Sequence, residues 1–251
     1  AGTRLSPRHL SIIAAANHGS VDVYRRPKVA VLSNGDELRP PGSVLSEGQI
    51  IASNGYSLCA LINTWGGEAI DLGAAPDDRA EIARRIESAG EVDLYVPIGG
   101  ASVGDHDHMK PVFQSLGFEE VFSKIAIKPG KPLTFGHFRG VPVIGLPGNP
   151  ASTLVTFALL ARPYLLRRLG VRQVEPLQFK VPAGFAWDKP GNRREYLRGR
   201  LEQGRLVAYR NQSSGVLRSA AWADGFIEVV EGTTVAQGDL LNFIPLSEVL
   251  G

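Results

Sequence analysis

Strand-like and helix-like segments alternate along the chain from about residue 28 to residue 170, and this alternation limits the fold more than any other feature. In Lys28–Leu32, every position after the lysine is apolar, which is typical of a strand buried on both faces. Further strands are predicted at 68–72, 92–98, 133–136 and 141–146, with an extended segment at 118–127. Helices are predicted at 48–65, 77–88, 109–116 and 149–169. The short connections favour a three-layer α/β fold with a mostly parallel sheet.

The pattern changes after Gly170. Residues 175–251 lack helical periodicity and contain several short strand-like runs separated by turn sequences. These runs lie at 177–181, 195–200, 206–209, 226–230 and 240–244. We therefore predict an α/β domain at 28–172 and a small all-β domain at 173–251. Residues 1–27 contain a short helix that begins at Ser6-Pro7, and we interpret them as the remainder of an N-terminal domain.

Composition excludes several classes of function. Lys and Arg number 27 against 25 Asp and Glu, and a formal net charge of +2 provides no long-range field to favour nucleic acid or an anionic membrane. Arginines recur between 193 and 218, but Glu195 and Glu202 interrupt them, so solvation or contact with a small anion is favoured over nucleic-acid binding. No apolar stretch approaches the roughly 20 residues of a bilayer span. A single cysteine, Cys59, and the lack of a signal-peptide pattern indicate a cytoplasmic protein.

Four loops that follow predicted strands carry the candidate chemistry. They are 33–38, 99–105, 128–132 and 146–150. Because ligands in open α/β sheets bind beyond the carboxyl ends of the strands, these loops should surround one crevice. The run Gly99-Gly-Ala-Ser-Val-Gly104 can present backbone N–H groups to a phosphate, although an ordinary strand-to-helix turn also uses glycine. This run matches neither the dinucleotide fingerprint nor the NTPase phosphate loop.

The loops also supply acids, cations and a helix start. The acids are Asp36, Glu37, Asp77, Asp78, Asp105 and Asp107, and one or two such carboxylates suit Mg²⁺, although each can instead cap a helix or face solvent. The run Asp105–His108 can bind a transition metal, but nothing else in the sequence completes that site. On a continuous strand Lys124 and Lys128 would share a face and hold an oxyanion, unless they only protect a sheet edge. Asn149-Pro150 begins the longest predicted helix, whose N-terminus is a potential anion site.

Six collinear segments closely resemble the molybdopterin molybdenumtransferase family, which is similar to the gephyrin E domain. The segments lie at 31–38 (VLSNGDEL), 48–54 (GQIIASN), 76–78 (PDD), 99–107 (GGASVGDHD), 124–132 (KIAIKPGKP) and 145–152 (GLPGNPAS). The resemblance extends from about residue 28 to residue 170, and the tail fits the family's C-terminal β domain. Asn34 stands where the family usually has Thr, and Ala101 where Val or Gly is usual; neither change should disturb the loops.

The resemblance implies an activity and a set of site residues. With Mg²⁺ and molybdate, the enzyme would cleave the phosphoanhydride of adenylylated molybdopterin, release AMP and insert molybdenum into the dithiolene. Matched by motif position, the catalytic residues would be Glu37, Asp77, Asp78, Asp107, Lys124 and Lys128, with Glu37 and Asp107 as metal ligands. The residues binding molybdopterin or phosphate would be Gly99, Gly100, Ser102, Gly104, Lys131, Pro147, Gly148, Asn149, Ser152, Arg198 and Ser214.

The resemblance also implies partners. It suggests a homodimer of the full-length protein, with a cleft shared between protomers, and contact with the adenylyltransferase of the same pathway. Because the family has two further N-terminal domains, this chain alone can bind ligand without turning it over. Two other functions stay open: a molybdopterin adenylyltransferase, and a non-catalytic molybdopterin-binding or scaffold module. The Gly35-Asp-Glu-Leu38 segment and the β domain argue against the adenylyltransferase.

Overall fold

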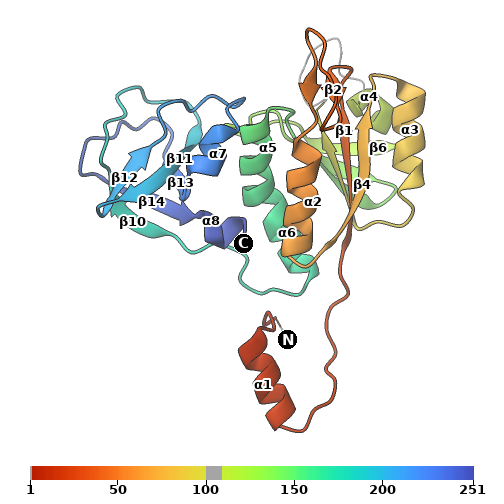
Figure 1. Ribbon diagram of the computed structural model, residues 1–251, viewed down its shortest axis with the longest axis horizontal. Coiled ribbons are helices and arrows are strands. Elements are labelled where there is room, and N and C mark those ends of the chain that lie inside the picture. Colours follow the sequence, from red (N-terminus) through yellow and green to blue (C-terminus); the bar gives the residue numbers. More distant parts are fainter. Residues whose placement is uncertain (1, 100–108) are drawn as a thin grey trace.

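The computed structural model describes residues 2–99 and 109–251 (Figure 1). Its first six-stranded sheet has the order β4-β1-β5-β9-β8-β6. The strands are β1 (Lys28–Asn34), β4 (Glu68–Ala75), β5 (Leu94–Ile98), β6 (Phe118–Phe122), β8 (Thr134–Phe138) and β9 (Val141–Gly145). Strands β4, β1, β5 and β9 are parallel, whereas β8 and β6 pair antiparallel at one edge. The sheet is therefore mostly parallel, as predicted, with an antiparallel edge.

Helices cover both faces of this sheet, and the strand β1 contributes to both cores (Figure 1). The helices are α2 (Asn54–Thr64), α3 (Arg79–Ser88), α4 (Met109–Ser115), α5 (Pro150–Thr156), the π-helical turn η1 (Phe157–Ala161) and α6 (Arg162–Arg168). Val29 and Val31 pack with buried residues of α2, η1 and α6, whereas Ala30 and Leu32 pack with α3 and α4. Successive side chains of a strand point to opposite faces, so the apolar run 29–32 within β1 requires two covered faces. The predicted three layers are confirmed.

The C-terminal residues form a second, antiparallel sheet with its own apolar core. Its strands are β10 (Phe179–Pro182), β11 (Arg194–Glu202), β12 (Arg205–Ala208), β13 (Gly225–Val229) and β14 (Leu240–Pro245), in the order β10-β14-β13-β11-β12. Each predicted strand-like run overlaps one of these strands. The prediction of an all-β domain missed two helices, α7 (Arg218–Trp222) and α8 (Leu246–Val249). At five and four residues, they are too short to give a helical period.

The two sheets are joined by packing and by a shared strand. Val155 and Ala158, from α5 and η1, pack against Phe226 and Ile244 of the second sheet. In addition, β7 (Ile127–Lys128), which comes from the α/β part of the chain, pairs in parallel with β11. The second sheet therefore fixes a segment of the α/β region.

Two predicted elements are wrong in their extent. The helix expected at 48–65 begins only at Asn54, because Gly48 has a φ of +80° and the backbone N–H of Ile50 bonds to the Glu37 carbonyl at 2.9 Å. The short strands β2 (Leu38–Arg39) and β3 (Ile50–Ile51) form there instead. The extended segment 118–127 is broken between β6 and β7. Strand alternation therefore does not put Lys124 and Lys128 on one face.

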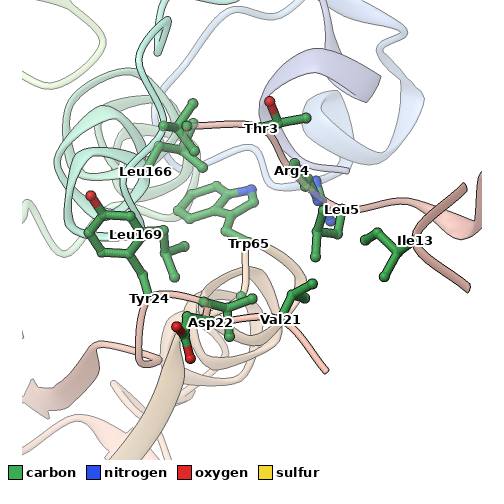
Figure 2. Close-up of a pocket in the computed structure, with 14 residues that line it drawn as sticks. Thr3, Arg4, Leu5, Ile13, Val21, Asp22, Tyr24, Trp65, Leu166 and Leu169 are labelled. Atoms are coloured by element: carbon green, nitrogen blue, oxygen red, sulfur yellow. The ribbon is translucent and has the colours of Figure 1, made fainter. Parts of the chain in front are cut away.

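Residues before β1 form α1 (Pro7–Ala15), which lies apart from both sheets, and a long connection that leads from it to the start of β1 (Figure 1). The helix buries none of its residues. Between residues 2–5, residues 21–24 and α6 lies an open pocket of about 400 Å³, with the Trp65 indole in its wall (Figure 2). This ring stacks on Phe157 with 5.0 Å between ring centroids. Among the described residues, no helix has both the length and the apolar character needed to cross a membrane.

Candidate functional site

A cleft of about 440 Å³ lies at the carboxyl ends of the parallel strands. Residues that follow four of the strands line it, together with the start of α2. They include Asn34, Gly35, Glu37, Asn54, Asp77, Gly99, Pro147, Gly148 and Asn149. The chain passes from β1 to β4 on one side and then to β5 on the other, so the cleft lies at a reversal of strand order, where open α/β sheets bind ligands. Of the predicted loops, 128–132 contributes Pro132.

Glycine allows these loops to approach one another. Gly99 has a φ of +88°, and a Cβ there would lie 2.8 Å from the Asn34 carbonyl oxygen. A Cβ on Gly148 would lie 3.6 Å from the Gly99 Cα. The loops after β1, β5 and β9 thus meet backbone to backbone, which leaves room for a ligand to approach main-chain groups.

Hydrogen bonds join the loops after β1 and β4. The Asn34 side-chain amide donates to the Pro76 carbonyl at 3.1 Å. The backbone N–H of Asp77 donates to Asp36 Oδ1 at 2.8 Å, and the N–H of Asp36 donates to Asp77 Oδ2 at 3.4 Å. Across the cleft, Asn54 Nδ2 donates to the Gly148 carbonyl at 2.7 Å. These hydrogen bonds therefore fix the loops around the cleft relative to one another.

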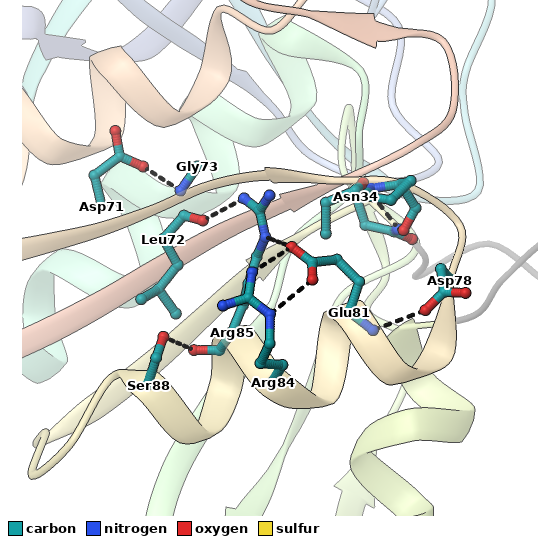
Figure 3. A network of polar contacts seen from close by, with 11 residues as sticks. Asn34, Asp71, Leu72, Gly73, Asp78, Glu81, Arg84, Arg85 and Ser88 are labelled. Atoms are coloured by element: carbon teal, nitrogen blue, oxygen red, sulfur yellow. Dashed lines mark hydrogen bonds and ion pairs between the residues drawn. The ribbon is translucent and has the colours of Figure 1, made fainter.

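The two candidate acids after β4 lie in different surroundings. Asp77 lines the cleft together with Glu37. Asp78 is the N-cap of α3, and its Oδ1 accepts from the Glu81 N–H at 2.8 Å (Figure 3). In the next turn of α3, the Glu81 carboxylate accepts hydrogen bonds from Arg84 and Arg85. These bonds lower the pKa of Glu81 to about 2. Glu37 and Asp77 thus line the same cleft, whereas the Asp78 side chain caps the N-terminus of α3.

The three candidate lysines are exposed and do not line this cleft. Lys128 lies in β7, and its Nζ is 3.2 Å from Oε1 and 3.1 Å from Oε2 of Glu195 in the second sheet. Lys124 lies between β6 and β7, and Lys131 immediately precedes the cleft residue Pro132. The lysine segment therefore runs from the second sheet to the rim of the cleft.

The N-terminal end of α5 meets a loop of the second domain. Asn149 takes the N-cap position, and its Nδ2 donates to Ser214 Oγ at 3.1 Å. The Ser214 carbonyl accepts from the Ala151 N–H at 2.9 Å. Ser152 is buried in the same turn, and Pro147 lies beside it with its carbonyl bonded to the Thr153 hydroxyl at 2.5 Å. Ser214 is thus placed at the wall of the cleft.

Arg198 lies beneath that loop and is 1% exposed. Its Nε donates to Ser219 Oγ at 3.1 Å and its Nη2 to the Ser213 carbonyl at 3.2 Å. Gln212 brackets its backbone, accepting from the Arg198 N–H and donating to the Arg198 carbonyl, both at 2.9 Å. Burial lowers the pKa of Arg198 to about 10, and no carboxylate of the described residues forms an ion pair with it. Arg198 itself does not line the cleft, but it bonds to the 211–217 loop, whose Ser214 contacts the cleft residue Asn149.

Four candidates, Gly100, Ser102, Gly104 and Asp107, lie outside the described residues, as does the run Asp105–His108. Within residues 2–99 and 109–251, no three His, Cys, Asp or Glu side chains gather to hold a metal. Glu37 and Asp77 nevertheless offer the one or two carboxylates that Mg²⁺ needs when substrate oxygens and water complete its shell. The carboxylates that line the described part of the cleft therefore fit Mg²⁺.

Sequence reasoning missed the role of Glu195, which had appeared only as an interruption in a run of arginines. Its contact with Lys128 joins residues 67 positions apart. It also missed Gln212, which holds the backbone of Arg198. No local pattern marks either residue, because both contacts depend on how the two sheets meet.

Comparison with known proteins gives a family match for each of the two sheets. Residues 30–167, more than half of the chain, match the family described as "Probable molybdopterin binding domain". Residues 180–246 match "MoeA C-terminal region (domain IV)". The molybdopterin molybdenumtransferase of Haemophilus influenzae is 36% identical over 260 aligned positions, covering 100% of this chain and 64% of that protein. That of Nostoc sp. is 38% identical over 207 positions, covering 80% of this chain and 47% of that protein.

A solved structure of a related protein has a similar fold. The molybdopterin biosynthesis MoeA protein from Pyrococcus horikosii superposes with a TM-score of 0.85 and 37% identity. The match covers 97% of this chain and 60% of that one. The chain thus spans roughly half to two thirds of the length of these relatives.

Proposed function

Because this chain belongs to the molybdopterin molybdenumtransferase family, we propose that it forms the substrate cleft of an enzyme of molybdenum cofactor biosynthesis. The proposed reaction inserts molybdate into adenylylated molybdopterin and releases AMP. The observation that carries this proposal is the cleft at the carboxyl ends of β1, β4, β5 and β9, which combines glycine-bearing loops with Glu37 and Asp77.

Each part of the cleft suits one part of that substrate. The close-packed loops at Gly99 and Gly148 expose main chain to phosphate oxygens, and Asn149 and Pro150 at the start of α5 line the same space. In the proposed reaction the oxygen of a water molecule attacks one phosphorus of the phosphoanhydride and the bridging P–O bond breaks, which gives AMP and leaves the other phosphate on molybdopterin. The two dithiolene sulfurs displace two oxygen ligands of molybdate, which take up protons and leave as water, and the oxidation state of molybdenum does not change.

Glu37 and Asp77 would hold Mg²⁺, and Asp107 would be a further ligand. When bound, Mg²⁺ neutralises negative charge that develops on the phosphoanhydride oxygens. By their motif positions, Lys124, Lys128 and Lys131 would supply cations for molybdate or phosphate, and Gly100, Ser102 and Gly104 would bind phosphate.

The second domain contributes through Ser214 and Arg198. Ser214 contacts Asn149 in the cleft wall, and Arg198 holds the loop that carries it. We propose that this domain shapes the site, rather than serving as a separate module. We also propose a cytoplasmic homodimer of the full-length protein that receives its substrate from the pathway's adenylyltransferase.

A turnover assay tests the proposal. The natural full-length protein is mixed with adenylylated molybdopterin, molybdate and Mg²⁺, and AMP and the molybdenum-loaded product are measured. AMP release that requires both molybdate and Mg²⁺ is expected. Consumption of ATP with molybdopterin would instead indicate an adenylyltransferase. Binding without AMP release would indicate a non-catalytic module.

A further inference from the structure

We propose that Glu195 is a positioning residue for Lys128, so that the second domain sets the place of a cation that acts in the first. This inference rests on the proposed function, in which Lys128 holds an anionic group of the substrate. No sequence motif or family resemblance assigned a role to Glu195.

The contact is specific in its geometry. Both carboxylate oxygens of Glu195 lie within 3.2 Å of Lys128 Nζ. The two residues are also register partners, because β7 and β11 pair in parallel with Lys128 opposite Glu195. The side chains therefore start from adjacent backbone positions, so little freedom is left to the ammonium group.

Burial separates this pair from ordinary surface ion pairs. The Glu195 side chain is 5% exposed, whereas that of Lys128 is 46% exposed. A buried carboxylate needs a charged partner, and Lys128 is the cation within ion-pair distance of it among the described residues. The exposed side of the ammonium is free to meet a ligand. Glu195 thus anchors one side of a cation whose other side faces solvent.

The strand pairing does not depend on the carboxylate. The backbone N–H of Arg194 donates to the Ala126 carbonyl at 3.0 Å, and Arg193 Nη1 donates to the Ile127 carbonyl at 3.2 Å. Glu195→Gln keeps the size of the side chain and leaves these bonds in place. This variant removes the charge of Glu195 without removing the β7–β11 contact.

The charge change predicts a split between kcat and KM. Loss of the Glu195 charge makes the site more positive, so an anionic substrate should bind no more weakly. Lys128 would lose its fixed position, which lowers transition-state stabilisation. A residue that only supports the fold would instead raise KM and lower the melting temperature together.

Three variants of the full-length protein test the inference. In Glu195→Gln, kcat for AMP release should fall about tenfold or more, with KM unchanged or lower. Glu195→Asp, which keeps the charge, should recover part of that loss. Glu231→Gln is the matched control, because Glu231 forms an exposed pair with Arg194 on the same strand and should leave kcat unchanged.

A second readout does not depend on the proposed reaction. Brief acylation by an N-hydroxysuccinimide ester, followed by mass spectrometry, reports how freely Lys128 reacts, with the exposed Lys180 as an internal reference. Glu195→Gln should raise the Lys128 rate about threefold or more, since the amine is released from its ion pair. Equal rates in the wild type and Glu195→Gln, or an unchanged kcat, would overturn the inference. A wild-type protein that releases no AMP would overturn the proposed function. The acylation rates would still show whether Glu195 restrains the Lys128 amine.

Discussion

The carboxylate of Asp93 joins three segments that are distant in sequence. It accepts from Arg25 Nη1 at 2.7 Å and Nη2 at 2.5 Å, from Arg168 Nη2 at 2.6 Å and from the Lys28 N–H at 2.8 Å. These hydrogen bonds lower its pKa from 3.8 to about 2, with that from Arg25 the largest cause. A single side chain thus ties the connection before β1 to the end of α6.

This pKa predicts a pH dependence of stability. A carboxyl group with a lowered folded-state pKa stabilises the protein above its unfolded pKa of 3.8, and that stabilisation is lost as the pH falls toward 2. Asp93→Asn should therefore lower the free energy of unfolding at pH 7 by about 1–2 kcal/mol, since solvent screens the exposed Arg25. Urea unfolding at pH 7 and pH 2.5 measures the difference. A wild-type-to-variant difference that does not shrink at pH 2.5 would contradict this account.

The neighbouring acids Asp77 and Asp78 should respond differently to the same change. Asp77→Asn removes a cleft carboxylate and should lower kcat/KM by about 10- to 100-fold, with little effect on stability. Asp78→Asn keeps an N-cap and should have a much smaller effect on kcat/KM, whereas Asp78→Ala should destabilise the protein by about 1 kcal/mol. AMP release and thermal unfolding measure the two properties. Equal kinetic losses in the two Asn variants would show that both acids act in the reaction.

At the scale of elements, the 211–217 loop depends on a buried cation. Arg198 uses the fork of its guanidinium to reach Ser219 and Ser213 together. Lys in its place has one charged group and cannot span both partners. Arg198→Lys should therefore increase hydrogen exchange in residues 211–217 and weaken substrate binding. Faster exchange across all of β11 and β13 would indicate general unfolding instead, and unchanged exchange would show that the loop does not need the arginine.

The sequence predicted the α/β elements well because their signals are local. The apolar run within β1 and the Asn149-Pro150 sequence at the start of α5 are each contained in a few residues. The start of α2 was misplaced because Ile50 and Ile51 have apolar spacing that suits a helix, but their backbone pairs with Leu38 and Arg39. Tertiary pairing overrode the local pattern there.

The candidate site was predictable in outline but not in its connections. Motif order placed Glu37, Asp77 and Asn149 at one crevice, and the structure brings them together. The link from Lys128 to Glu195 joins different sheets, and no periodicity reports it. The different positions of Asp77, in the cleft, and Asp78, at the N-cap of α3, could be told apart only once the first residue of the helix was known.

At the scale of the whole molecule, the two domains share a small apolar junction. Phe226 is fully buried there and packs with Val155 of α5 and Ala158 of η1. Phe226→Ala should destabilise the protein by about 3–5 kcal/mol, because it leaves a cavity between the domains. Calorimetry should show the two domains unfolding more independently than in the wild type. One sharp transition with an unchanged midpoint would indicate that the junction does not couple them.

The most direct test of the account is a calorimetric titration of adenylylated molybdopterin, with and without Mg²⁺. Wild-type protein, Glu37→Gln and the remote variant Glu87→Gln are compared; Glu87 lies on α3 and pairs with Arg139. Mg²⁺ should tighten binding in the wild type and in Glu87→Gln, whereas Glu37→Gln should lose this gain. Equal Mg²⁺-dependent tightening in all three proteins would contradict the assignment of the cleft as the substrate site.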